Sequence, residues 1–155
     1  MTGPPVVIEM SARIEAPPEV VWGYLVDWEH LGSWMIEGKR FKVTSPHRQG
    51  LGVTAEATIR IAGITTTDPV EVTRWEPPHT LEISHRGWVG GRGLMLCRSA
   101  PWGTFLYWRE TLVPPLGIPG AIGLRLFKPI MRRTFDRDLR LLKQLAEKAP
   151  AEGVQ

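Results

Sequence analysis

The sequence predicts an α+β domain in which a curved, seven-stranded antiparallel sheet wraps around one long C-terminal helix, with two short helices after the first strand. Apolar residues alternate with a period of two in seven segments, which short turns containing Gly or Pro connect. The period changes to three and four residues after the first strand and again over the last third of the chain. An apolar sheet face needs a cover, and the C-terminal segment is the longest amphipathic element. With 155 residues, the chain is expected to form a single domain over 1–155, ordered from about 6 to 148.

The first strand is expected over Val6 to Ile14, where apolar and polar residues alternate. Pro17 and Pro18 end this strand and suit the first turn of a helix from Glu19, where a missing N–H costs nothing. Asp27 is the expected N-cap of a second short helix, which should end at Gly38.

Six more strands with short turns predict a meandering antiparallel sheet. Pro69 places part of its strand at an edge or a bulge, because proline cannot donate to a ladder. The glycine-rich segment Gly87 to Gly93 is expected to be a loop. The strands are expected over Arg40 to Ser45, Val53 to Ile61, Ile64 to Trp75, Thr80 to Arg86, Leu94 to Ala100 and Thr104 to Val113.

The C-terminal segment has its large apolar residues, from Phe127 to Leu145, on one helical face. Pro129 removes a helix hydrogen bond, so a short helix followed by a long helix to about Lys148 is expected. The last residues, 150–155, are expected to fray.

The C-terminal segment is also basic: residues 116–148 carry eight basic and three acidic side chains, whereas the rest of the chain is slightly acidic. Such a segment can contact nucleic acid or an anionic membrane. It lacks interleaved aromatic residues and a reading motif, so nucleic-acid binding is not expected, and a solvated helix face explains the charge. The apolar segment 116–122 is interpreted as the loop that starts the helix, with an entrance lid that touches a membrane as the alternative.

Several chemistries lack their signatures. Cys97 is the only cysteine, and the four histidines form no metal-binding pair, so neither a disulfide within the chain nor a metal site is expected. Neither a Gly-x-Ser-x-Gly elbow nor a complete dinucleotide fingerprint occurs, so no cofactor is expected. The N-terminal MTGPPVVIEM has no signal-peptide pattern, and a cytoplasmic location is expected.

His85 is a candidate for acid–base chemistry because it shares the strand phase of Leu81 and Ile83. An imidazole that faces a cavity can act as a general acid or base near neutral pH. The competing interpretation, which is the favoured one, is a hydrogen-bonded or hydrated histidine at a strand end.

The role of Glu110 depends on the register of the last two strands. If Ala100 pairs with Thr104, then Leu96 and Arg98 share a face with Trp108 and Glu110. A slip of one residue is expected to send Glu110 to solvent and Tyr107 inward. An inward carboxylate or hydroxyl would suit a polar contact with a ligand. Both registers remain open.

Three segments resemble the START-like (SRPBCC) superfamily, and within it the polyketide cyclase/dehydrase and lipid-transport group. They are Ala16 to Trp34, which contains PPEVVWGYLVD, the strand start Gly103 to Trp108, and the helix segment Arg137 to Lys143. The resemblance extends over residues 6 to 147. It implies a helix-grip fold with a hydrophobic ligand cavity between the sheet and the C-terminal helix, and it transfers no catalytic set.

The leading hypothesis is a non-catalytic protein that binds a hydrophobic small molecule such as a lipid, polyketide or quinone. The first alternative is an aromatase/cyclase or dehydratase that uses His85, Glu110 or Tyr107 for acid–base chemistry. The second is a lipid- or quinone-handling accessory protein that docks on membranes through its basic helix. The expected ligand-binding residues are Met10, Trp34, Ile59, Ile61, His85, Leu96, Arg98, Trp108, Glu110, Phe127, Met131 and Phe135.

Overall fold

The computed structural model describes residues 1–149, so the fraying expected of 150–155 lies outside the described residues. Seven strands form one antiparallel sheet in the order β1-β7-β6-β5-β4-β3-β2, as predicted. The strands are β1 (Val6–Ile14), β2 (Gly38–Val43), β3 (Thr54–Ile61), β4 (Ile64–Glu76), β5 (Thr80–Arg86), β6 (Gly90–Ala100) and β7 (Gly103–Val113). The helices are α1 (Pro18–Leu25), the 3-10 helix η1 (Trp28–Ser33) and α2 (Gly117–Lys148).

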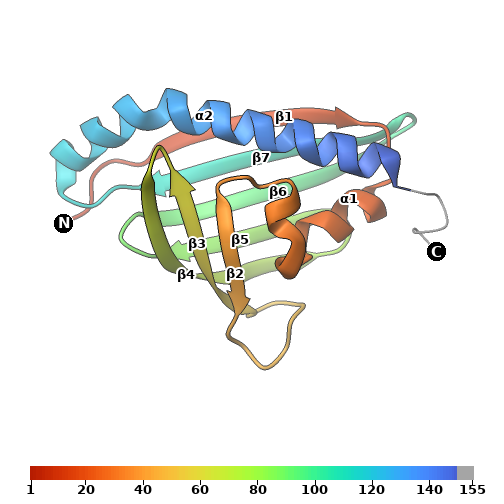
Figure 1. The fold of residues 1–155 in the computed structure, drawn as a ribbon, viewed down its shortest axis with the longest axis horizontal. Coiled ribbons are helices and arrows are strands. Elements are labelled where there is room, and N and C mark those ends of the chain that lie inside the picture. The colour runs from red at the N-terminus through yellow and green to blue at the C-terminus, as the bar shows by residue number, and fades with distance from the viewer. Residues whose placement is uncertain (150–155) are drawn as a thin grey trace.

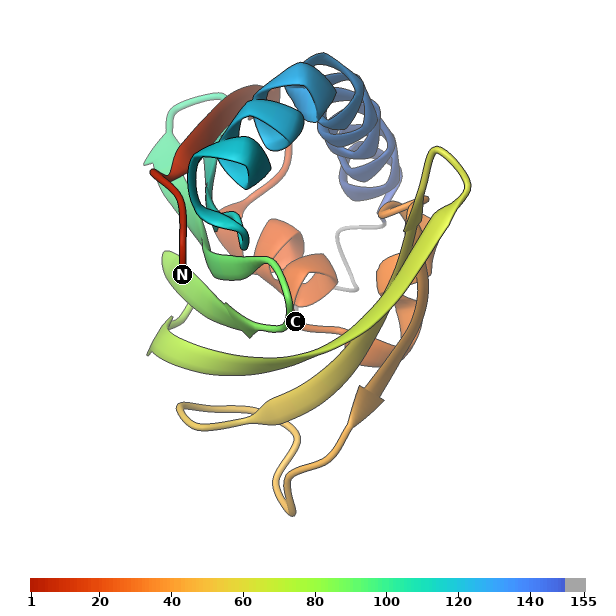
Figure 2. The same cartoon turned by 90° about the vertical axis from the view of Figure 1, so that its left-hand side faces the viewer.

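The sheet curls around α2, which lies along β1 and β7 (Figures 1 and 2). At the other side of the sheet, the β3–β4 hairpin curves up toward α2 (Figures 1 and 2). One hydrophobic core lies on the concave side and includes Ile8, Trp34, Leu81, Leu106 and Leu142, each at most 2% exposed. The apolar phase of the strands and the apolar face of α2 therefore meet, as the sequence pattern predicts.

The two short helices close one end of the concave face. Pro18 lies at the start of α1, as its missing N–H predicts. The second helix is a 3-10 helix that ends at Ser33, so the expectation that it extends to Gly38 is wrong. Gly38 instead begins β2, where a Cβ would lie 2.4 Å from the Phe41 ring, so this position needs a residue without a side chain.

Two features of β4 follow from its pairing. Pairing between β4 and β5 reaches only to Val70, so Pro69 pairs with β3 alone, on a locally free edge. The register shift in this ladder falls between Val72 and Arg74.

The turn between β6 and β7 is one residue shorter than in the register that pairs Ala100 with Thr104, because Ala100 pairs with Gly103. Met95 and Cys97 therefore oppose Trp108 and Leu106 on the concave face. The expectation that a slip turns Glu110 outward is wrong: the slip changes the phase of β6, whereas buried Leu106 and Trp108 fix the phase of β7. The strand β6 also begins at Gly90, within the segment expected to be a loop.

The helix α2 is continuous through Pro129, so the expected division into a short and a long helix is wrong. The cavity-facing Phe127 and Met131 lie on either side of the proline, and their burial offsets the one lost hydrogen bond.

The C-terminal half of α2 is attached to β1. The Nζ of Lys143 donates to the carbonyl oxygen of Arg13 at 2.7 Å, which fixes α2 to β1.

Candidate ligand-binding cavity

A cavity of about 340 Å³ lies between the concave face of the sheet, η1 and the N-terminal half of α2. This volume falls within the range of about 300–1,000 Å³ that is typical of small-molecule sites. Nearly all of its wall is apolar. Its lining side chains include Trp34, Glu37, Ala57, Ile59, Ile61, Ile64, Asp68, His85, Trp88, Trp108, Glu110, Leu124, Phe127, Met131 and Phe135.

Three aromatic side chains form one side of the cavity. The ring centroids of Trp34 and Trp108 lie 6.3 Å apart in an edge-to-face arrangement. Trp108 also packs against Phe135 of α2, with centroids 4.9 Å apart. Aromatic pairs at these distances are stabilising beyond their buried area, so this side is expected to be rigid.

The main polar feature of the wall is a chain of three side chains, which we call the polar corner: His85, Glu110 and Trp108. The Nε2 of His85 lies 2.9 Å from the Oε2 of Glu110. The indole Nε1 of Trp108 donates to the Oε1 of Glu110, also at 2.9 Å. Glu110 is only 7% exposed, and these two contacts are what make its burial tolerable.

His85 is held closer to its protonated form than a free histidine. Burial is the largest single influence and lowers its pKa, but the charge of Glu110, the hydrogen bond to Glu110 and the charge of Asp68 together raise its pKa above the ordinary value. The side chain of His85 is 28% exposed, so its ring is accessible as well as paired. An imidazole in this state can donate a hydrogen bond or a proton to a guest in the cavity.

Gly93 on β6 makes room for Glu110. The two residues are directly paired across β6 and β7. A Cβ at Gly93 would lie 2.5 Å from the Oε1 of Glu110, well inside van der Waals contact. The glycine-rich start of β6 is thus the local sequence feature that lets a carboxylate occupy the concave face.

A second polar feature is a pair of buried carboxyl groups, Glu37 before β2 and Asp138 on α2. Glu37 is 4% exposed and lies on the cavity wall, and Asp138 is fully buried. The backbone N–H of Ile36 donates to the Oδ1 of Asp138 at 3.2 Å. Burial and a hydrogen bond between the two carboxyl groups raise the pKa of Asp138, and burial raises that of Glu37. The pair therefore retains a proton well above the pH at which free carboxyls lose theirs.

Most of the residues expected to bind a ligand lie on this wall: Trp34, Ile59, Ile61, His85, Trp108, Glu110, Phe127, Met131 and Phe135. Leu96 and Arg98 lie on the opposite face, since the tighter turn reverses the phase of β6, so their expected inward orientation is wrong. Met10 is buried in the core and is not a wall residue. The Tyr107 side chain also points outward, where its hydroxyl donates to Glu9.

Glu37, Asp138 and Asp68 were not among the site residues predicted from the sequence. Glu37 and Asp138 are far apart in the chain, and each lies in a segment where a charged residue is typical of solvated surface. Asp138 had one detectable signal: it falls one turn after Phe135, Met131 and Phe127 on the apolar face of the helix.

Other candidate chemistries remain unsupported in residues 1–149. These residues contain no cluster of three or more side chains that could hold a metal ion. Burial raises the pKa of the Cys97 thiol to about 12, which keeps it un-ionised and unreactive. Among the described helices, none is both long enough and apolar enough to cross a membrane.

Comparison with known proteins places this architecture in the START-like superfamily. Residues 5–147 match the family described as "Polyketide cyclase / dehydrase and lipid transport", and the chain belongs to this family. The predicted helix-grip fold is confirmed by the Zhui aromatase/cyclase from Streptomyces sp. R1128, which aligns with a TM-score of 0.79 and 16% identity over 96% of this chain and 98% of that chain.

Two further similarities extend the comparison. The structure of TTHA0849 from Thermus thermophilus has a TM-score of 0.75 and 20% identity, over 94% of this chain and 100% of that chain. The uncharacterized protein Rv1546 of Mycobacterium tuberculosis is 26% identical over 80 residues, which is 52% of this chain and 56% of that protein. The chain thus spans about half the length of the curated relatives it matches.

Proposed function

We propose that this protein binds one apolar small molecule in the cavity, with an oxygen atom of the guest hydrogen-bonded at the polar corner. The observation that carries the proposal is a cavity of about 340 Å³ with an almost wholly apolar wall and the His85–Glu110 pair at one place on it. Burial of apolar surface supplies the affinity of such a site, and a few polar groups fix the orientation of the ligand. Family membership supports a lipid- or polyketide-like guest.

The size and chemistry of the cavity limit the guest. The volume equals that of about ten water molecules in the liquid, which suits a compact ring system better than a two-chain lipid. The raised pKa of His85 favours its protonated form, in which Nε2 faces Glu110 and Nδ1–H can donate to a guest, so a carbonyl, phenol or enolate oxygen fits the polar corner.

The binding test uses 2-naphthol, an aromatic phenol, as the probe in isothermal titration calorimetry. Ala57 lies on the cavity wall, and Ala57→Phe fills part of the cavity. Its neighbour Glu56 is exposed on the other face of β3, so Glu56→Phe is a matched control. The expected result is saturable binding that Ala57→Phe abolishes and Glu56→Phe leaves intact. Equal binding by all three proteins would overturn the proposal.

A second candidate function is acid–base catalysis of cyclisation or dehydration on a polyketide-like substrate. The observation that favours it is the 2.9 Å contact between the Nε2 of His85 and Glu110 on an apolar wall, because an imidazole paired with a carboxylate can exchange a proton with a substrate. Loss of one water from a poly-β-keto thioester, followed by mass spectrometry, measures this activity. Turnover that disappears in His85→Gln while affinity is unchanged would favour catalysis over simple binding.

A further inference from the structure

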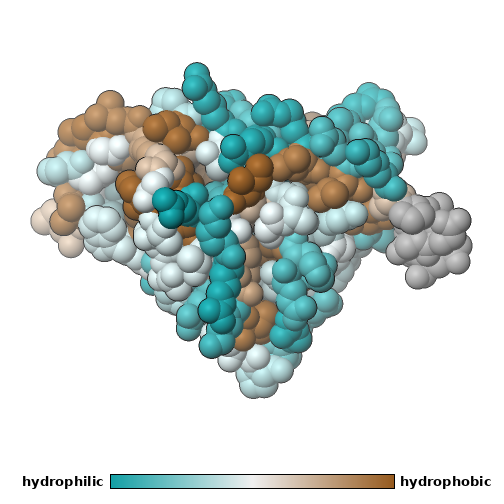
Figure 3. Space-filling model, viewed as in Figure 1, coloured by the Kyte–Doolittle hydropathy of each residue, from teal (hydrophilic) through white to brown (hydrophobic). Residues whose placement is uncertain are grey.

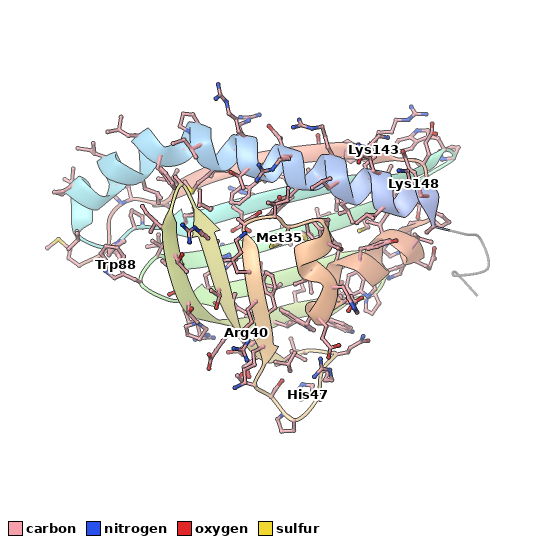
Figure 4. The ribbon with its side chains drawn as sticks, in the orientation of Figure 1. Met35, Arg40, His47, Trp88, Lys143 and Lys148 are labelled. Carbon is pink, nitrogen blue, oxygen red and sulfur yellow. The ribbon has the colours of Figure 1, made fainter. Side chains whose placement is uncertain are left out.

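An exposed apolar surface borders the cavity at the N-terminal end of α2. Trp88 and Ile64 line the cavity and are also 69% and 63% exposed. The apolar end of the molecule is visible over the start of α2 in Figure 3, and Trp88 lies at the same end in Figure 4. We define the apolar rim as the exposed side chains of Ile64, Trp88, Ile118, Ile122, Leu126 and Ile130.

The rim residues on α2 recur every fourth position from Ile118 to Ile130, so they lie on successive turns of the helix. Leu124, Phe127 and Met131 on the same helix face the cavity. This half of α2 is therefore apolar on its outer side as well as its inner side, unlike an ordinary surface helix. Single exposed apolar residues need no explanation, but four on successive turns of one helix, together with two that line the cavity, indicate an interaction surface.

Positive charge accompanies the rim. Residues 111–135 contain no acidic side chain and four basic ones, Arg125, Lys128, Arg132 and Arg133. Arg132 lies 4.0 Å from Asp136, and the other three form no salt bridge within residues 1–149. The C-terminal half of α2 differs because acidic residues accompany its cations: Asp136, Asp138 and Glu147 lie there, and Lys143 pairs with Glu147.

We propose that the apolar rim and these four cations dock the protein on an anionic lipid membrane. Isoleucine and leucine side chains enter the boundary between head groups and acyl chains, tryptophan prefers that interface, and cations meet anionic head groups. A second copy of the chain fits this surface less well. A two-fold symmetric contact would bring the four cations of one copy against those of the other. The expectation that residues 116–122 form a loop is wrong: the chain turns at Leu116, whose φ is 65°, and α2 already begins at Gly117. Ile118 and Ile122 therefore lie on the helix and form part of the docking surface.

Docking in this orientation places the mouth of the cavity against the lipid. If the cavity holds an apolar guest, as proposed above, that guest passes between bilayer and protein without crossing water. This exchange rests on the proposed function, whereas docking itself does not.

The test is flotation with vesicles of phosphatidylcholine, with and without phosphatidylglycerol. The double variant Ile118→Asp/Leu126→Asp changes two side chains that are 69% and 77% exposed, so folding should be unaffected. Leu51→Asp is the matched control, because Leu51 is 65% exposed on the β2–β3 loop, away from α2 (Figure 4 labels His47 on this loop). Binding to anionic vesicles should fall about a hundredfold in the double variant, since each buried side chain contributes at least about tenfold, and should be unchanged in Leu51→Asp.

Charge variants, salt dependence and a measurement of oligomeric state separate membrane docking from self-association. Arg125→Gln/Arg133→Gln should weaken binding to anionic vesicles by about fivefold per cation, and higher salt should weaken binding of the wild type. Failure of the wild type to bind anionic vesicles would overturn the proposal, as would equal loss in Leu51→Asp. A stable dimer that the double variant dissociates, without vesicle binding, would assign the rim to self-association instead. Uptake of 2-naphthol by the double variant should be normal, so the two proposals can fail separately.

Discussion

Replacement of Gly93 by alanine tests whether the space opposite Glu110 holds the polar corner together. The added Cβ would lie 2.5 Å from the Oε1 of Glu110, so the carboxylate must move away from Trp108 or the strands must separate. The bond from the Trp108 Nε1 to this oxygen is then lost, and a buried indole N–H is left without a partner.

Gly90→Ala on the same strand is the matched control, because its Cβ would make an ordinary 3.7 Å contact with the His85 carbonyl oxygen. Both substitutions gain about 0.5–1 kcal/mol from lower backbone entropy in the unfolded chain. The difference between the two variants therefore isolates the hydrogen bond to the carboxylate, about 1.5–3 kcal/mol.

Urea unfolding of the two variants and of the wild type measures this difference. For a chain of this length, the predicted gap corresponds to a Tm difference on the order of 5 °C. NMR titration of the His85 ring gives a second readout. In Gly93→Ala its pKa should fall, because burial is no longer opposed by a nearby Glu110 charge. Equal stability of the two variants together with an unchanged His85 titration would refute this reasoning.

Three more predictions follow from the cavity and its carboxyl groups. In the wild type, the free energy of unfolding should fall by up to about 1.4 kcal/mol per pH unit between about pH 5 and pH 8, since the folded Glu37–Asp138 pair keeps a proton that the unfolded carboxyls release. Because the pKa of Asp138 is raised in the folded state, the stabilisation from the protonated pair is largest below the pKa of unfolded carboxyls and decreases as pH rises. Asp138→Asn should flatten the slope of unfolding free energy against pH, and parallel slopes for the variant and the wild type would contradict this prediction. Phe135→Ala should cost about 3–5 kcal/mol in urea unfolding, and Phe135→Leu less, because both remove packing on Trp108. Phe105→Ala on the exposed face of β7 should cost under about 1 kcal/mol, and similar losses for Phe105→Ala and Phe135→Ala would refute the buried packing. Glu110→Gln should lower the His85 pKa measured by NMR, because the carboxylate charge that raises it is removed, and an unchanged His85 pKa would contradict the pairing.

Most of this fold could be predicted from the spacing of apolar residues, because burial of one face of a strand or helix imposes that spacing directly. The strands Val6–Ile14 and Thr80–Arg86 begin and end where the alternation of apolar and polar residues does. The phase of His85 with Leu81 and Ile83 was equally visible, and all three side chains lie on the cavity wall.

Features that depend on contacts between distant residues were not predictable. A turn of two or three residues after Ala100 gives the same local pattern, yet it decides whether Arg98 or Met95 faces inward. Pro129 suggested a helix break, whereas tertiary packing on both sides keeps α2 continuous. The meeting of Glu37 with Asp138 depends on how α2 crosses the sheet, which no local pattern records.

Native mass spectrometry of freshly purified protein tests most directly whether the cavity carries a guest. The expected spectrum contains a species heavier than the bare chain, whose extra mass is extracted into organic solvent and is absent from the cavity-filled Ala57→Phe variant. A spectrum of bare chain alone, from protein that also fails to take up 2-naphthol, would contradict the account.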